Sequence, residues 1–293
     1  MRVFLTGATG FVGSAILPEL LAAGHQVLAY ARSDGTAAKL TALGAQVQRG
    51  ELTDLASLTA GAKASDAVIH TAFIHDFSKF MENVEIDRLA TRALVEALAG
   101  SGKTLITTSG LASLQHGRTA TEADLPISPE IPRVAAETMV IDAASQGIRS
   151  AVVRLAPSVH GAGDHGFVPL LINLAREQGY AAYVGDGGNL WPGVHRLDAG
   201  TLYRLILEQA AAGLRWHGVA EEGVPMREIA GAIGQGLNIP VKSLNAEEAE
   251  AYFTWFLRFA SMNIPTSSTV TRKLLGWQPT GPGLLADMRA NYF

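Results

Sequence analysis

The sequence predicts an α/β protein of the Rossmann type: a doubly wound parallel sheet with a smaller C-terminal substrate-binding domain. Short apolar runs that favour strands alternate with segments of helical periodicity over the first half of the chain. The first of these runs leads into a glycine-rich turn and then into a helix, as in dinucleotide-binding folds. Alternation of this kind produces a parallel sheet that is buried under helices on both faces.

The elements of this sheet follow one another in a regular order. Buried strands are predicted at residues 3–6, 26–30, 45–48, 66–72, 103–109 and 150–156. Helices are predicted at residues 11–25, 83–100 and 133–147. Gly24 and Gly147 stand where helices usually end, because glycine readily adopts the left-handed C-cap conformation. Pro18 removes one backbone donor from the first helix, so we expect a kink or a late helix start there.

The second half of the chain is irregular and rich in loops. We predict a dinucleotide-binding domain from residues 1–157 and about 190–218, and a substrate domain from about 158–189 and 219–293. No internal repeat or low-complexity linker separates the two. The stretch AYFTWFLRF near residue 255 could line an apolar pocket, but aromatic residues at helical spacing more often pack in a core. We therefore interpret it mainly as packing.

Composition excludes several classes of function. The chain of 293 residues carries a formal net charge of -4 without a Lys/Arg cluster, which argues against nucleic-acid binding. It has no cysteine, which excludes disulfides and thiolate ligands, and its histidines lack metal-ligand spacing. Glycines and a proline interrupt the apolar N-terminus, and no stretch reaches the length of a membrane span. We expect a soluble, cytoplasmic protein that binds no metal, membrane or nucleic acid.

The turn TGATGFVG carries three regularly spaced glycines at the junction between the first strand and the first helix. One glycine permits the tight turn, another lets the backbone approach a pyrophosphate, and the last lets the helix pack on the strand. Free N–H groups at the helix start then face negative charge. The turn therefore predicts a dinucleotide site made by Gly7, Thr9, Gly10, Phe11, Val12 and Gly13.

The end of the second strand indicates which dinucleotide binds. NAD sites offer a carboxylate about 20 residues after the glycines, but this chain has Arg32 and Ser33 there. Arginine suits a 2′-phosphate, because its planar fork of donors matches phosphate oxygens. Alternatively, Arg32 is a solvated strand end and Asp34 binds the ribose. We favour NADP(H) over NAD(H), and we expect Glu51 and Leu52 to flank the adenine.

The motifs TGATGFVG, DAVIHTAF, TTSG and RLAPSVHGAGD, in this order, resemble the extended and atypical short-chain dehydrogenases/reductases, the NAD(P)-dependent epimerase/dehydratase relatives. The resemblance covers nearly the whole chain. It implies hydride exchange between a nicotinamide cofactor and a small organic substrate. It also implies a possible homodimer, because the helices that contain Arg92 and Ala136 correspond to those that pair in many relatives. We expect further cofactor contacts at Thr71, Ala72, Phe73, Thr108, Arg133 and Pro157.

The resemblance also reveals a gap in the catalytic residues. The family uses a Tyr-x-x-x-Lys pair for proton transfer, and a glutamate typically follows the lysine four residues later. Aligning on Glu137 puts Arg133 at the lysine position and Pro129 at the tyrosine position, and no tyrosine in the chain has a lysine four residues on. Asp87 takes the position of the family's catalytic asparagine. One atypical subgroup shares this Asp-for-Asn change and a degraded pair, and the chain most resembles that subgroup.

Other residues are candidates to complete the chemistry. Ser109, or its neighbour Thr108, takes the position of the family's hydroxyl and could bind a substrate carbonyl, or could simply cap backbone. Arg133 could hold the cofactor ribose, but it cannot move a proton because a guanidinium stays protonated. His160 is a candidate proton donor where relatives often have tyrosine, although a loop histidine more often makes a structural hydrogen bond. His75 could also face the pocket.

Three functions follow from these residues. The leading hypothesis is an NADP(H)-dependent oxidoreductase that acts on a carbonyl or hydroxyl of a small organic substrate. A non-catalytic NADP(H)-binding redox sensor is the alternative, because Pro129 has no ionisable side chain. A sugar-nucleotide epimerase or dehydratase ranks third, because those enzymes depend on the missing tyrosine.

Overall fold

The molecule, as a computed structural model, is described at residues 1–115, 117–209 and 211–293. Its main sheet has 7 parallel strands in the order β10-β6-β5-β4-β1-β2-β3. Their bounds are β1 Arg2–Thr6, β2 Gln26–Ala31, β3 Gln46–Arg49, β4 Ala67–His70, β5 Thr104–Gly110, β6 Arg149–Leu155 and β10 Leu214–Gly218. The strand order reverses between β1 and β4, which is the switch point of a Rossmann fold. The predicted fold class and its strands are confirmed.

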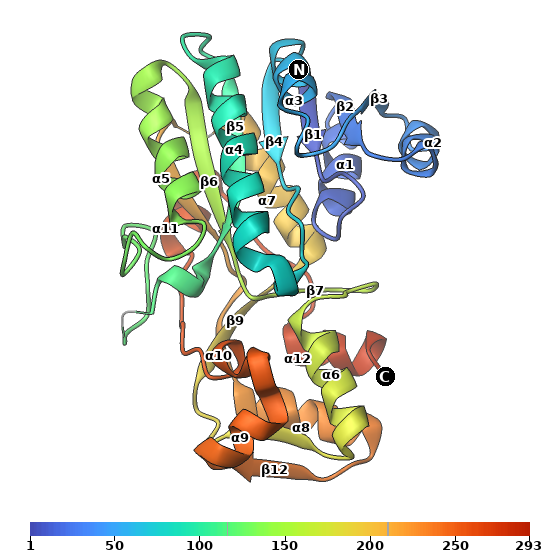
Figure 1. Ribbon diagram of the computed structural model, residues 1–293, viewed down its shortest axis with the longest axis vertical. Helices are drawn as coiled ribbons and strands as arrows, with labels where there is room; N and C mark the ends of the chain where they lie inside the picture. The colour runs from blue at the N-terminus through green and yellow to red at the C-terminus, as the bar shows by residue number, and fades with distance from the viewer. Residues whose placement is uncertain (116, 210) are drawn as a thin grey trace.

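Helices cover both faces of this sheet, which is why its central strands β1, β4 and β6 are almost wholly buried. The helices are α1 Gly13–Ala22, α2 Asp34–Ala42, α3 Leu55–Lys63, α4 Phe80–Leu98, α5 Val134–Asp142 and α7 Arg196–Gln209. The apolar sides of α1, α2 and α7 pack on one face, and those of α3, α4 and α5 pack on the other. Figure 1 shows α4 in front of the sheet and α7 behind it.

The predicted helices are present, with differences at their ends. The third ends in a short 3-10 turn, and Gly147 follows it in the left-handed conformation. Pro18 lies inside α1, which begins at Gly13, so the expectation of a late helix start is wrong. Neither α2 nor α3 was predicted; α2 has Leu40 as its one buried residue and so carries no apolar stripe.

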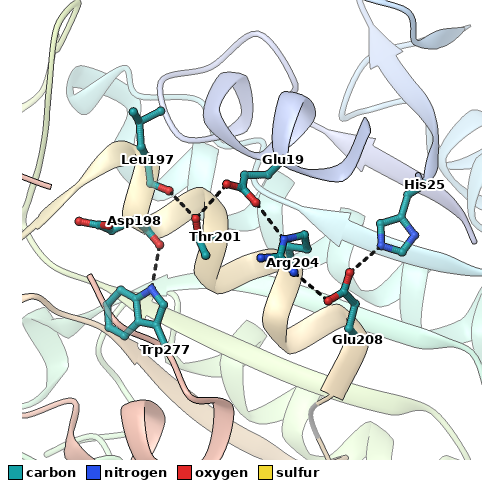
Figure 2. A network of polar contacts seen from close by, with 8 residues as sticks. All are labelled: Glu19, His25, Leu197, Asp198, Thr201, Arg204, Glu208 and Trp277. Atoms are coloured by element: carbon teal, nitrogen blue, oxygen red, sulfur yellow. Dashed lines mark hydrogen bonds and ion pairs between the residues drawn. The ribbon is translucent and has the colours of Figure 1, made fainter. Parts of the chain in front are cut away.

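Helix α7 returns to the main sheet late in the chain and is tied to α1. Thr201 Oγ1 and Arg204 Nε donate to the two carboxylate oxygens of Glu19 at 3.0 Å and 2.9 Å, within the polar network of Figure 2. Gly200 allows the two helices to lie close together, since a Cβ there would be 2.8 Å from the carbonyl oxygen of Ala15. The late segment thus supports the helix that follows the glycine turn.

The remaining elements gather around a second hydrophobic cluster, and Figure 1 shows most of them below the main sheet. The strands are β7 Ser158–His160, β8 Ala181–Val184, β9 Leu190–His195, β11 Glu221–Pro225 and β12 Val241–Leu244. The helices are α6 Phe167–Gln178, α8 Met226–Leu237, α9 Ala246–Phe253, α10 Leu257–Ala260, α11 Thr269–Leu275 and α12 Leu284–Asn291. Of these, α11 packs on α7 and the main sheet. The exact limits of the two domains stay a prediction.

Two findings concern partners. Among the described residues, no helix is both long enough and apolar enough to pass through a bilayer. The same residues contain no group of three or more His, Cys, Asp or Glu side chains that could bind a metal. The expected lack of membrane and metal partners stays a prediction.

Candidate functional site

A cavity of about 1440 Å³ opens along the carboxyl edge of the main sheet. This is the edge where ligands of doubly wound folds bind. The cavity brings together every residue that the sequence predicted as a cofactor contact, namely Gly7, Thr9, Gly10, Phe11, Val12, Gly13, Arg32, Ser33, Glu51, Leu52, Thr71, Ala72, Phe73, Thr108, Arg133 and Pro157. Asp87 and Ser109 line it as well. The roles of these residues stay predictions, but their convergence is a property of the fold.

The glycine turn, which we call the cradle, packs too closely against its neighbours to hold side chains at Gly7 and Gly13. Gly7 has a φ of 72°, and a Cβ there would lie 2.7 Å from both the Ala72 nitrogen and the Thr71 hydroxyl. A Cβ at Gly13 would collide with the carbonyl oxygen of Gly7. The N–H of Gly10 donates to the same carbonyl at 2.8 Å, which closes the turn just before α1. A turn of backbone that lines the cavity at a helix start fits a dinucleotide pyrophosphate.

At the end of β2 the cavity presents an arginine. The exposed Arg32 side chain lines the cavity and makes no ion pair with any described residue. Asp34 lies outside the lining and pairs with Arg49, whose Nη1 donates to it at 2.5 Å. Arg49 Nη2 also donates to the Arg32 carbonyl at 2.9 Å. Sequence reasoning missed Arg49, although its place at the end of the neighbouring strand β3 was available as a signal.

The segment at the position of the family's Tyr/Lys pair is not helical. A Tyr-x-x-x-Lys spacing needs one helical turn to bring its side chains together. Here α5 begins only at Val134, and Arg133 is its N-cap. Pro129 is exposed and lies outside the cavity lining. Pro129 and Pro132 each lack an N–H and disfavour helical backbone in the preceding residue, so the helix cannot extend back across this segment.

Arg133 is held by several contacts at once. Its Nη2 donates to the Thr108 carbonyl at 2.8 Å, and its Nε lies 3.5 Å from a carboxylate oxygen of the buried Asp87. Its guanidinium carbon lies 4.2 Å from the centre of the Phe73 ring. Its backbone adopts a φ of 73°, which is costly for a residue with a side chain. The surroundings therefore fix this guanidinium at the cavity wall.

His70, to which the sequence assigned no special role, extends this network. It is buried at the end of β4, with Nδ1 2.7 Å from the Thr6 hydroxyl and Nε2 3.5 Å from Asp87. Asp87 thus lies between an imidazole and the Arg133 guanidinium. The signal available in the sequence was the position of His70 at the carboxyl end of a strand beside the switch point.

The two neighbouring hydroxyls at the end of β5 have different surroundings. Thr108 Oγ1 donates to the His70 carbonyl at 3.1 Å and lies 2.6 Å from the Tyr203 hydroxyl. Because a threonine hydroxyl has one hydrogen, Tyr203 is the donor to Thr108. Burial raises the pKa of Tyr203, which therefore stays protonated. Thr108 is thus engaged by the fold, and Ser109 is the hydroxyl that remains for a ligand.

The buried carboxylate of Glu137 lies near Ser109 and is paired with two arginines. Burial alone would raise the pKa of Glu137, but hydrogen bonds from Arg154 and Arg215 outweigh it and lower that pKa. Arg154 donates to Glu137 through Nε at 3.1 Å and Nη2 at 2.5 Å. Glu137 is therefore ionised, and one of its carboxylate oxygens accepts from both Arg154 and Arg215.

His160 is not in the place that the sequence suggested. It is fully buried, its Nδ1 lies 2.8 Å from Asp287, and it does not line the cavity. It thus makes the structural hydrogen bond that is usual for a loop histidine, with Asp287 of α12. Its role as a proton donor stays a prediction, which this position outside the lining does not favour. His75 and His165 line the cavity instead. Burial of the ring and the positive charge of Arg133 lower the pKa of His75.

The comparisons with known proteins agree with this geometry. Residues 3–217 match the NAD dependent epimerase/dehydratase family. An uncharacterized protein of Schizosaccharomyces pombe is 48% identical over 100% of both chains, and a 2-alkyl-3-oxoalkanoate reductase of Stenotrophomonas maltophilia is 28% identical over 82% of this chain and 77% of the reductase. The solved structure of a Thermus thermophilus UDP-glucose 4-epimerase with NAD superposes with a TM-score of 0.76 at 20% identity, covering 99% of this chain and 97% of the epimerase. The chain therefore belongs to the NAD-dependent epimerase/dehydratase family, within the short-chain dehydrogenase/reductase superfamily, whose members bind a nicotinamide cofactor.

Proposed function

We propose that the protein is an NADP(H)-dependent oxidoreductase that interconverts a carbonyl and a hydroxyl on a small organic substrate. The observation that carries the proposal is one continuous cavity that joins the glycine cradle to Ser109 and Arg133. A reductase among the relatives supports the same class of reaction. The cavity, at about 1440 Å³, exceeds the range of roughly 300–1,000 Å³ that is typical of single small-ligand sites, so it has room for a cofactor and a substrate.

The choice of NADP(H) rests on charge at the end of β2. A site for NAD offers a carboxylate to the ribose hydroxyls, whereas an arginine fork suits a 2′-phosphate. Arg32 lines the cavity without an ion-pair partner among the described residues, and Arg49 already pairs with Asp34. We therefore assign the 2′-phosphate to Arg32, with Arg49 keeping the nearby carboxylate away.

Different residues of the chain contact the substrate oxygen and the cofactor. A bound nicotinamide supplies or accepts the hydride. Ser109 donates a hydrogen bond to the substrate oxygen, because the neighbouring Thr108 hydroxyl is already engaged by His70 and Tyr203. Arg133 keeps a positive charge and spare N–H donors at the cofactor side, with Asp87 and Phe73 fixing its position. The proton that completes the alcohol comes from water, since an arginine cannot release one.

The test is turnover with purified protein and NADPH. A panel of aldehydes, ketones and quinones is screened for loss of NADPH absorbance, with oxidation expected for at least one class. Ser109→Ala should then lower kcat by about 100-fold, because one preorganised donor to the developing oxyanion is lost. Ser109→Thr keeps the hydroxyl and should retain most activity. Absence of turnover across the panel, in protein that binds NADPH, would overturn the catalytic proposal.

A second function is favoured by one observation. Pro129 lies outside the cavity, and the described residues offer no tyrosine–lysine pair there. A redox sensor that binds NADP(H) without catalysing a reaction would not need this pair. Tight binding of NADPH, weaker binding of NADP⁺ and no turnover would support it. A sugar-nucleotide epimerase stays the least favoured, because it needs the missing tyrosine.

A further inference from the structure

Aromatic side chains converge where α6 and the residues between α9 and α10 line the cavity. We call Phe73, Phe77, Phe80, Phe167, Trp255 and Phe259 the aromatic wall; all of them line the cavity. They come from the segment after β4, from the start of α6 and from the break between α9 and α10. Their rings form a continuous surface, with centroids 5.2 Å apart for Phe77 and Trp255 and 4.9 Å apart for Phe167 and Phe259.

Trp255 is the exposed member of the aromatic wall. It is 53% exposed, whereas the other three tryptophans of the chain are at most 2% exposed. It follows Thr254, which has a φ of 50° and interrupts the helix between α9 and α10. A β-branched residue in this conformation is strained. The Trp255 indole is therefore an exposed apolar surface at the cavity, and such a surface suits a ligand.

Charge in this part of the cavity is sparse and mixed. Among the described residues after β6, Arg258 is the one lysine or arginine that lines the cavity. Asp164 and Glu177 contribute carboxylates. Burial raises the pKa of Asp164. A diphosphate needs several charge-assisted donors, as arginine forks provide. The wall offers planar apolar surface instead, continued by Leu170, Leu174 and Met262.

We infer that the substrate is a flat, apolar, conjugated carbonyl compound whose ring joins the stack of Phe77 and Trp255. The two rings are inclined by only 27°, so a planar group packs against them better than a puckered one. Phe73 connects this wall to the Arg133 guanidinium, which directs the carbonyl of a stacked ligand toward Ser109. The inference rests on the proposed function and narrows it to one substrate class.

The test is calorimetric titration of acetonaphthone, a planar aryl ketone, into the full chain with and without saturating NADP⁺. The NADP⁺ complex cannot turn over, so binding alone is measured. Wild-type protein should bind acetonaphthone at least about 10-fold more tightly than cyclohexanone or UDP-glucose. Trp255→Ala should weaken acetonaphthone about 10-fold, and Trp255→Phe should restore it to within about 3-fold. NADP⁺ affinity should stay within about 2-fold in both variants.

The matched control is Leu274→Ala, because Leu274 is also exposed, at 57%, but lies on α11 outside the cavity. It should leave acetonaphthone binding unchanged. Equal affinity for acetonaphthone and cyclohexanone, tighter binding of UDP-glucose, or an indifferent Trp255→Ala would each overturn the inference. If the protein takes up no NADP⁺ but still binds acetonaphthone through Trp255, the proposed function fails and the aromatic site stands.

Discussion

The two ends of the cavity are built in opposite ways. At the cofactor end, one short segment presents backbone, and the glycines are required because side chains would collide with Ala72, Thr71 and the turn itself. At the other end, the aromatic wall presents side chains from segments that are far apart in the sequence and meet only in the folded chain. The first end is specified locally and tolerates little change. The second is specified by tertiary packing and can change its ligand without altering the cradle.

This difference predicts that variants in the glycine cradle affect both coenzymes, while variants at the aromatic wall affect one class of substrate. The Arg133 region lies between the two ends, since its guanidinium contacts Phe73 and Asp87 together. Changes there should produce intermediate effects. The predictions below test this gradient.

The largest effect is expected at the cradle. Gly13→Val places a branched side chain where even a Cβ collides with the Gly7 carbonyl, so the turn must move. NADPH affinity should fall at least about 100-fold, roughly 2.7 kcal/mol, as measured by calorimetry. The control is Gly231→Ala, where a Cβ meets nothing within 4 Å, and it should bind NADPH normally. Normal binding by Gly13→Val would disprove the cradle.

A smaller, selective effect is expected at Arg32. Arg32→Ala removes the guanidinium that we assign to the 2′-phosphate, so NADPH affinity should fall about 10- to 100-fold, the loss expected for a charge-assisted bidentate contact. NADH has no 2′-phosphate, and its affinity should change by less than about 3-fold. Parallel titrations of both coenzymes measure the ratio. An equal loss for the two would mean that Arg32 does not read the phosphate.

The next effect is expected between the two ends. Arg133→Lys keeps the charge but loses the planar contact with Phe73 and the fork that reaches Thr108. We expect kcat to fall about 10-fold while the KM for the substrate changes little, because positioning and not charge is lost. Steady-state kinetics separate the two parameters. A lysine variant with full kcat would show that a point charge is sufficient.

The smallest effect is expected for the titration of His75 in the wild type and in Arg133→Ala. Burial and the charge of Arg133 hold the pKa of His75 below its ordinary value of 6.5, so the ring is neutral at neutral pH. Removing the guanidinium leaves burial as the main cause, so the pKa should rise toward its ordinary value. NMR titration of the imidazole resonances measures it. A pKa that falls in the variant would show that Arg133 does not act on His75.

The same contrast explains what could be read from the sequence. The glycine turn and the strand ends were predictable, because local backbone geometry restricts residue type and strand order brings the ends together. The position of His160 outside the cavity lining could not be read from the sequence, because its partner Asp287 lies 127 residues away along the chain. The place of Trp255 at the cavity could not be read from the sequence, because helical spacing indicates packing and the Thr254 that interrupts the helix is visible only in three dimensions.

The segment around Pro129 lies between these cases. The sequence showed that the tyrosine and lysine are missing, which is a statement about residue identity. It did not show that α5 starts after both positions, or that His70, Asp87 and Arg133 form one network. Those features depend on how β4, α4 and the start of α5 meet.

Calorimetric titration of the unmodified chain with NADPH and with NADH tests the central claim most directly. The account predicts saturable binding at one site, tighter for NADPH than for NADH. If neither coenzyme is taken up, the cradle holds no dinucleotide, and the assignment of the cofactor end of the cavity is contradicted.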